Sequence, residues 1–293
     1  MSGDSYHDGE RAVQDRAGVA DMAARIGRGI HSEIPSPASE FLAAQRFAVV
    51  GAARGDGSVW ASIVTGRPGF LGAIDSSTLV VASHADPADP LAEIWNSPAE
   101  IGLLAIDFAA RRRMRINGDA RPAPDGFEVR TRQVYANCPK YIRPRVLVND
   151  EPSDIGSTAA LPSEVSSLST DAQELIRHSD TFFVASALAG AGADASHRGG
   201  DPGFVTIVDE RTLVWPDYAG NTMFQTLGNI EADGRAGLLF VDFATGDLLH
   251  VSGNARLIWD DPRIAATPGA ERLIALSVAG VVERPNAIAL RWR

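Results

Sequence analysis

The sequence has almost no cysteine, no long apolar run and no excess of basic residues, and each shortage excludes a class of protein. The one cysteine among 293 residues, Cys138, excludes an intramolecular disulfide framework and a cysteine-rich zinc site. No apolar run approaches the roughly 20 residues of a membrane-spanning helix. A formal net charge of -10 argues against broad contact with a nucleic-acid backbone. Because the N-terminal stretch is polar and unlike a secretory signal, we expect a cytoplasmic protein without membrane or nucleic-acid partners.

An internal repeat organises the rest of the chain. ASIVTGRPGF (61–70) resembles ASHRGGDPGF (195–204), and IDSSTLVV resembles VDERTLVW at the same offset of 134 positions. GLLAIDF and GLLFVDF follow at an offset of 135, as do RINGDAR and HVSGNAR. One single-residue gap over this length indicates a duplication. Its period is that of a domain rather than of a solenoid repeat.

Each copy has the same order of expected elements. A short helix comes first, with Ser36 as N-cap before Pro37 in one copy, and Thr170 as N-cap with Gln173 three residues later in the other. Several short strands with glycine-rich turns and one more helix follow, which is typical of barrels or sandwiches. We therefore expect a mainly β (α+β) protein with an arm (1–35), a first domain (36–148), a linker (149–168) and a second domain (169–293).

The two copies differ on the strand that contains the AS…PGF pattern. His197 and Arg198 of the second copy correspond to Ile63 and Val64 of the first. A histidine and an arginine beside glycines suit an anion, because charge-assisted hydrogen bonds are stronger than neutral ones. The second copy is therefore the expected anion-binding one.

The start of the second helix differs in the same direction. The second copy has Gly220 and Asn221 there, where free backbone N–H groups and the helix dipole favour an anion. The first copy has Asp86 and Asp89, whose carboxylates would repel a phosphate. We expect the first copy to have a degenerate site.

The order ASHRGGDPGF, TLVWPDYAGNTMFQTLGNI, GLLFVDF and LLHVSGNARLI resembles the FMN-binding split-barrel family related to pyridoxamine 5'-phosphate oxidase. QVYANCPKYIRPR (133–145) resembles the duplicated, two-barrel branch of that family, and the resemblance covers most of residues 36–293. It implies two tandem antiparallel six-stranded split β-barrels, FMN as cofactor, and a homodimer with the flavin at the subunit interface.

The candidate cofactor-binding residues combine donors for a phosphate with an apolar slot for a ring. Gln225 and Asn229, four residues apart, share one helix face. Taken singly, Trp215 and Phe224 also fit a plain core, and the basic run 111–115 fits a solvated hairpin turn. No catalytic base and no metal site stand out. The candidates are Ser196, His197, Arg198, Gly199, Trp215, Pro216, Asn221, Phe224, Gln225, Asn229 and Lys140.

The expected function is that of an FMN-dependent oxidoreductase acting on an unidentified small organic substrate, with NAD(P)H or oxygen as the second reactant. The alternative is a non-catalytic protein that binds or handles flavin, deazaflavin F420 or haem. Haem would need His197 as axial ligand, and F420 would need a basic groove from the run 111–115 with Arg143 and Arg145. A third alternative is a dimeric scaffold with an empty site.

Overall fold

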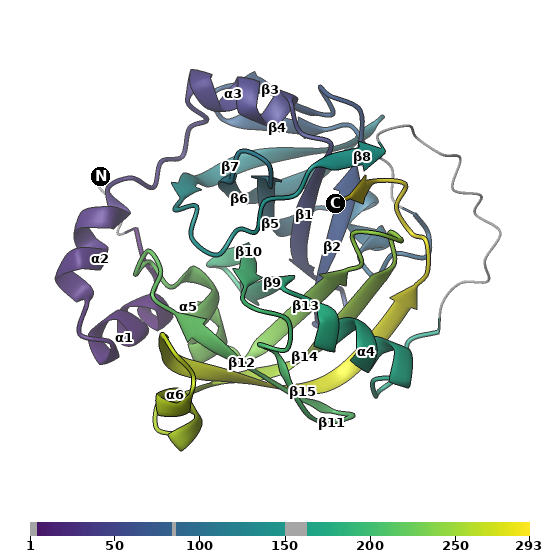
Figure 1. Ribbon diagram of the computed structural model, residues 1–293. Coiled ribbons are helices and arrows are strands. Elements are labelled where there is room, and N and C mark those ends of the chain that lie inside the picture. The colour runs from purple at the N-terminus through teal and green to yellow at the C-terminus, as the bar shows by residue number, and fades with distance from the viewer. Residues whose placement is uncertain (1–4, 84–85, 150–162) are drawn as a thin grey trace.

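The computed structural model describes residues 5–83, 86–149 and 163–293. These residues form two seven-stranded antiparallel sheets (Figure 1). The strand orders are β2-β1-β5-β6-β7-β4-β3 and β10-β9-β13-β14-β15-β12-β11. Each strand of the first sheet has its counterpart at the same place in the second, which fits the internal repeat.

The mainly β prediction is confirmed, but the expectation of six strands per barrel is not. Each sheet has seven strands because an additional edge strand, 71–75 in the first half and 206–209 in the second, follows the AS…PGF stretch. The edge strands β2 and β3, or β10 and β11, are not paired with each other, so neither sheet closes. The first sheet comprises β1 (Phe47–Ala53), β2 (Val59–Thr65), β3 (Leu71–Asp75), β4 (Thr78–Val81), β5 (Ala99–Asp107), β6 (Arg112–Ala123) and β7 (Gly126–Asn137).

The second sheet repeats this plan, and its strand β15 is longer than the equivalent β7. It comprises β9 (Thr181–Leu188), β10 (Gly192–Gly199), β11 (Thr206–Asp209), β12 (Thr212–Tyr218), β13 (Arg235–Val241), β14 (Leu248–Ile258) and β15 (Ala270–Arg284). A separate two-stranded sheet pairs β8 (Leu147–Asn149) with β16 (Arg291–Trp292). The end of the chain therefore returns to the first half.

Short helices lie outside the sheets, as expected. The N-cap of α4 is Ser169 rather than Thr170, and its side chain accepts a hydrogen bond from the Ala172 amide. The helix that was expected to begin after Ser36 includes that residue, with Pro35 as its N-cap. The helices are α1 (Asp8–Arg16), α2 (Ala20–Gly27), α3 (Ser36–Ala43), the 3-10 helix η1 (Ala92–Trp95), α4 (Thr170–His178), α5 (Gln225–Ala232) and α6 (Pro262–Ala266).

The two halves pack against each other through reciprocal strand contacts. β5 of the first half lies against β10 of the second, and β13 of the second lies against β2 of the first. The glycine of each GLL pattern lies at one of these contacts. A Cβ on Gly102 would lie 2.4 Å from the Asp194 backbone, and a Cβ on Gly237 would lie 2.5 Å from Trp60 Cα. The close approach brings β6 of the first half beside β10 of the second.

Most of the expected linker, residues 150–162, lies outside the described residues. Among the helices in the described part of the chain, none is long and apolar enough to cross a membrane.

Candidate functional site

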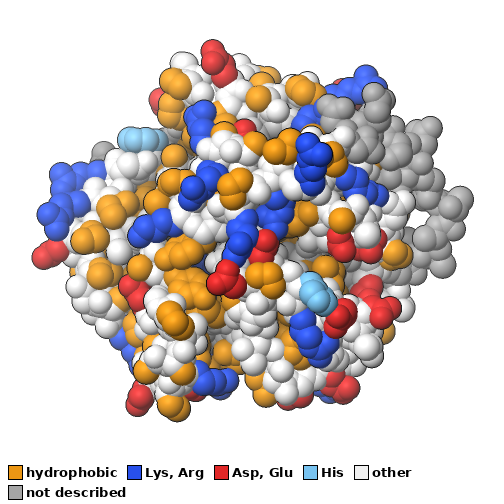
Figure 2. Space-filling view, viewed as in Figure 1, with side chains coloured by type: hydrophobic (Ala, Val, Ile, Leu, Met, Phe, Trp, Pro, Cys, Tyr) orange, Lys and Arg blue, Asp and Glu red, His pale blue; other side chains and the backbone are white. Residues whose placement is uncertain are grey.

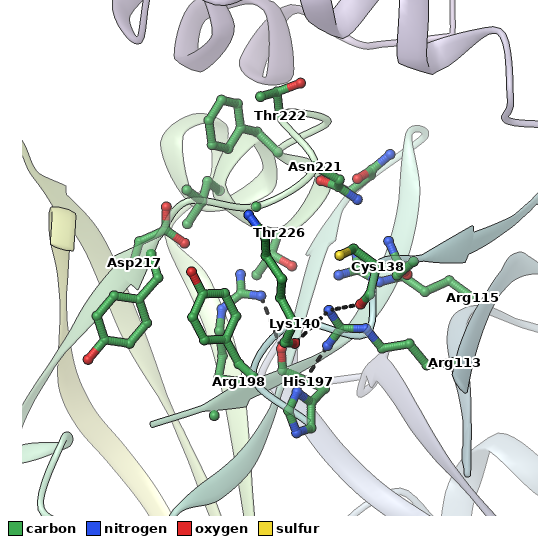
Figure 3. Close-up of a pocket in the computed structure, with 18 of the residues that line it drawn as sticks. Arg113, Arg115, Cys138, Lys140, His197, Arg198, Asp217, Asn221, Thr222 and Thr226 are labelled. Atoms are coloured by element: carbon green, nitrogen blue, oxygen red, sulfur yellow. Dashed lines mark hydrogen bonds between the residues drawn. The ribbon is translucent and has the colours of Figure 1, made fainter. Parts of the chain in front are cut away.

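A pocket lies where the first half meets the second, and both halves contribute its walls. The first half supplies Arg113 and Arg115 of β6, together with Asn137 at the end of β7 and Cys138, Lys140 and Tyr141 after it. The second supplies residues 197–199 of β10, residues 216–218 of β12 and residues 220–227 around the start of α5. Figure 3 shows Arg113 and Arg115 entering from one side and Asp217 facing them from the other. Figure 2 shows Lys and Arg side chains gathered across the middle of the molecule.

Arg115 forms the buried ion pair of the site. Its Nη1 donates to both carboxylate oxygens of Asp194, at 3.0 and 3.1 Å, and its Nη2 donates to Ser196 Oγ at 2.5 Å. Thr226 Oγ1 donates to the same carboxylate at 2.7 Å. Burial opposes the charge of Arg115, but the attraction of Asp194 outweighs it and raises the pKa of the guanidinium. This pair is complete without a ligand.

Arg113 and Arg198 have no such partner. Among the described residues, no carboxylate oxygen lies within 4.0 Å of either guanidinium. Arg113 donates to the Cys138 carbonyl at 2.8 Å, and Arg198 donates to Ser196 Oγ at 2.8 Å. The Nε atoms of both are buried and make no hydrogen bond to the described residues.

The guanidinium groups of the pocket repel one another. Burial, followed by the charges of Arg115 and Arg198, lowers the pKa of Arg113 to about 9. Burial also lowers the pKa of Arg198, while the nearby Asp217 opposes that shift. Asp217 itself pairs with Arg272 at 3.1 Å. The pocket therefore holds two positive charges that an anion would stabilise.

His197 supports Arg113 rather than lining an open surface. Its ring is 3% exposed and lies edge-on to Phe108 and Phe183. Its Nδ1 lies 3.0 Å from Arg113 Nη1. A guanidinium only donates, so Nδ1 is the acceptor and the proton of the neutral ring is on Nε2. Burial and then the charge of Arg113 lower its pKa well below the usual value, so His197 stays neutral.

The loop before α5 has a strained backbone. Thr222 and Phe224 have φ values of 60° and 61°, and Tyr141 across the pocket has 65°. Non-glycine residues seldom adopt this region, and such residues concentrate at binding sites. Thr222 Oγ1 and Gln225 Nε2 are buried without a hydrogen-bond partner among the described residues. The loop thus presents unused polar groups to the pocket.

Eight of the eleven candidate residues line this pocket, and three do not. Trp215 is 1% exposed and packs edge-on against Phe182 in the core, as its alternative interpretation allowed. Ser196 is fully buried, and its Oγ accepts hydrogen bonds from Arg115 and Arg198 instead of facing the pocket. Asn229 turns to the other side of α5, where its amide donates to Ser186 Oγ. The eight that line it are Lys140, His197, Arg198, Gly199, Pro216, Asn221, Phe224 and Gln225.

The sequence favoured a solvated hairpin turn for the run 111–115, but only part of the run is exposed to solvent. Only Arg111 and Arg112 are exposed, while Arg113 and Arg115 lie on one side of β6 and point into the pocket. The alternation of a strand places residues 113 and 115 on the same face, and this signal was present in the sequence. Asp217, Tyr141 and Tyr218 also line the pocket without having been predicted.

The matching pocket of the first half is lined by carboxylates that are already paired with an arginine. Arg284 Nη1 donates to Asp89 at 2.7 Å, and its Nη2 donates to Asp86 at 2.6 Å. Ser62, the counterpart of Ser196, also donates to Asp89. The first-half position therefore already contains its own anions. No group of three or more His, Cys, Asp or Glu side chains in the described ranges is arranged to hold a metal ion.

Comparison with known proteins gives a family match for residues 168–290. This segment matches the family model described as pyridoxamine 5'-phosphate oxidase. No curated protein matches the chain. Solved structures with local likeness include HupZ of Group A Streptococcus (16% identity, 39% of this chain and 91% of that chain, TM-score 0.32). Others are a FAD-binding protein of Mesorhizobium loti (13%, 43% and 99%, 0.32) and an FMN-binding protein of Syntrophomonas wolfei (8%, 38% and 86%, 0.29).

Proposed function

We propose that this chain, whose residues 168–290 belong to the pyridoxamine 5'-phosphate oxidase family, binds FMN between its two halves and is an FMN-dependent oxidoreductase. One observation carries the proposal: Arg113 and Arg198 point into one pocket with no carboxylate partner among the described residues. Uncompensated buried charge is costly in a folded protein. A bound phosphate would offset that cost.

The polar groups of the pocket suit a phosphate ester attached to a flat heterocycle. A phosphate monoester carries about -1.5 to -2 charges at pH 7, which matches the two guanidiniums. The unpartnered Nε atoms of Arg113 and Arg198 supply further donors. Gln225 Nε2 and Thr222 Oγ1 remain for ring nitrogens and oxygens.

Apolar and aromatic groups complete the pocket. Tyr141 and Tyr218 stack with ring centroids 5.3 Å apart, and Pro216 and Phe224 line the same cavity. A mostly apolar slot with a few directed polar groups is the usual form of a cofactor site. We assign the cationic end to the phosphate and this aromatic side to the ring.

When bound, FMN supplies hydride or electron transfer to and from a small organic substrate. The chain's own residues bind and orient it. Neither His197 nor Asp217 suits proton transfer, because Arg113 occupies His197 Nδ1 and Arg272 pairs with Asp217. We therefore assign no general base to the protein, and we propose NAD(P)H or oxygen as the second reactant.

The contact between the two halves of the chain brings Lys140 and Arg113 of the first half to a pocket whose other wall belongs to the second half. A homodimer with the flavin at the subunit interface stays a prediction.

Deazaflavin F420 is a second candidate, because exposed Lys140 lines the pocket and exposed Arg111 donates to the carbonyl of the neighbouring Pro139. Arg112 instead lies over the ring of Phe41. Arg143 and Arg145, also expected in such a groove, instead pair with Asp180. Haem has less support. The Nε2 atom of His197 is buried and its Nδ1 is already in a hydrogen bond, so neither nitrogen is free as an axial ligand.

The absorption spectrum tests the proposal. The purified protein, or protein mixed with FMN and then desalted, should retain the absorption bands of oxidised flavin, and NADH or NADPH should bleach them. A Soret band would replace flavin with haem. A colourless protein that does not retain FMN would contradict the proposed function and bring F420 or an empty scaffold forward.

A further inference from the structure

The N-terminal helices α1 and α2 have no role in the site described so far, yet they pack beside it. Figure 1 shows α1 next to α5 with α2 on the outer side of α1, and Figure 3 shows helices of the same colour above Thr222. At the crossing of α1 and α5, glycine faces glycine. A Cβ on Gly9 would lie 2.3 Å from the Gly228 carbonyl oxygen, and a Cβ on Gly228 would lie 2.6 Å from the Glu10 backbone. Such closeness requires a defined docking position.

Polar contacts fix that position from both ends of α1. His7 Nε2 lies 3.0 Å from Asn229 Oδ1, on the side of α5 that faces away from the pocket. Gln14, only 3% exposed, donates from Nε2 to the Met223 carbonyl at 3.0 Å. Met223 also packs in an apolar cluster with Tyr6, which precedes α1, and with Ala23 of α2. Through Met223, Gln14 therefore contacts the loop 220–224, most of which lines the pocket.

Met223 lies between the two strained residues of that loop. Thr222 and Phe224 flank it with positive φ values. The Met223 amide donates to Asn221 Oδ1 at 3.1 Å, and its carbonyl accepts from Gln14. One contact is local, whereas the other comes from a helix 209 positions away. A strained backbone persists only when its surroundings hold it, and Gln14 is the distant part of those surroundings.

We propose that Gln14 is a positioning residue for the pocket: its hydrogen bond to Met223 holds loop 220–224 in the conformation that binds the ligand. The ligand part of this inference rests on the proposed FMN function. Without the bond, the loop relaxes toward unstrained conformations, and the fraction of protein ready to bind falls. Apparent affinity falls with that fraction.

The test compares Gln14→Met with Gln173→Met. Methionine keeps the length of glutamine but lacks the donor. Gln173 on α4 also donates to a backbone carbonyl, that of Leu168, away from the pocket. Hydrogen exchange of residues 220–227 is measured on the unliganded proteins, and the Kd for FMN is measured by quenching of flavin fluorescence.

In Gln14→Met, exchange across the loop should rise about fivefold and the Kd for FMN should rise by a similar factor. Exchange in α4 and the folded content of the protein should stay unchanged. Gln173→Met should match the wild type in both measurements at the pocket. Wild-type loop exchange in Gln14→Met would overturn the proposal, as would faster exchange with an unchanged Kd. If the wild type binds no FMN, the proposed function fails, and loop exchange alone decides whether Gln14 holds the loop.

If Gln14→Met does not fold, Gly9→Ala provides the second variant, because its Cβ would push α1 away from α5 without changing a hydrogen-bonding side chain. It should produce the same rise in loop exchange. Unchanged exchange in a folded Gly9→Ala protein would also overturn the proposal.

Discussion

The two halves of the chain share a strand plan, but the pocket of the second half presents guanidiniums without carboxylate partners among the described residues, whereas the pocket of the first half contains carboxylates paired with an arginine. In the second half, Arg198 and the incoming Arg113 have no carboxylate partner among the described residues. In the first half, Asp86 and Asp89 pair with the incoming Arg284. Each half thus sends an arginine into the other half's pocket. Only the second-half pocket needs an anion from outside.

The difference comes from a few substitutions on equivalent strands. Val64 stands in place of Arg198, and His250 on β14 stands in place of Arg115 on β6. His250 is buried, lies 2.9 Å from the Ala61 carbonyl, and has a lowered pKa because of that burial. A neutral ring there needs no Asp194-like partner. The comparison teaches that carboxylates of the chain itself can pair with the arginine of a site and so take the place of a bound anion.

The largest expected effect follows from breaking the ion pairs in the first-half pocket. Asp89→Ala leaves the buried Arg284 with only Asp86, whose side chain is 40% exposed. Losing one partner of a buried pair costs about 3–5 kcal/mol. Thermal unfolding should show a large loss of stability, while FMN binding by the folded protein stays unchanged. Stability equal to the wild type would mean that the ion pair between Asp89 and Arg284 does not stabilise the folded protein.

Breaking the open pocket should affect the ligand instead of the fold. Arg198→Ala removes a charge-assisted contact, which contributes about 1.5–3 kcal/mol, so the Kd for FMN should rise roughly 10- to 150-fold. The unliganded protein should be at least as stable as the wild type, because an unpaired buried charge is gone. Calorimetric titration and thermal unfolding measure both effects.

The matched control is Val64→Ala, at the equivalent strand position of the first half. It should leave the Kd for FMN unchanged. A large loss of FMN binding in this variant, or none in Arg198→Ala, would show that the ligand binds in the other half.

A smaller effect concerns the N-terminal arm (1–35), whose helix α1 packs against α5 of the second half. Burial raises the pKa of Glu10 to about 8, and the charge of Asp194 adds to this shift. Between pH 4.5 and 8 the folded protein therefore holds a proton that the unfolded chain has lost, so stability falls as pH rises through this range. The loss should be on the order of 1–2 kcal/mol from pH 7 to 9.

Glu10→Gln should remove this pH dependence and unfold at higher temperature than the wild type at pH 9. The lowered pKa of His7 affects only lower pH values. Glu174→Gln, an exposed position on α4, is the control and should keep the wild-type profile. A wild-type profile in Glu10→Gln would show that the carboxyl titrates in its ordinary range.

The smallest effect sharpens the role of the basic run. Arg111 is exposed at the turn before β6, and Arg113 lies in the pocket. Arg111→Ala should change the Kd for FMN less than about twofold, because exposed charges are screened. A tenfold loss would extend the site outward along the basic turn and favour the larger anion F420.

The fold and the wall of the pocket that the second half supplies were predictable, because both depend on local and repeated patterns. The repeat indicated equivalent strands, and the contrast between Arg198 and Val64 pointed to the second half. The helix start was off by one at Thr170, because Ser169 is an equally good cap.

The rest of the pocket depends on contacts between segments far apart in the sequence. The pairing of Arg115 with Asp194 joins residues 79 positions apart, across the contact between the halves. Nothing near either residue indicates that contact. Asn229 shares a helix face with Gln225 by spacing, but α1 takes up its side chain, and the sequence contains no local sign of that docking.

The most direct test of the central claim is a calorimetric titration of the wild-type protein with FMN and, separately, with riboflavin, which lacks the phosphate. We expect one FMN per chain, because Arg284 in the first-half pocket is already paired with Asp86 and Asp89. We also expect riboflavin to bind at least tenfold more weakly, because the two guanidiniums lose their anion. Equal affinities for FMN and riboflavin, or two FMN per chain, would contradict the account.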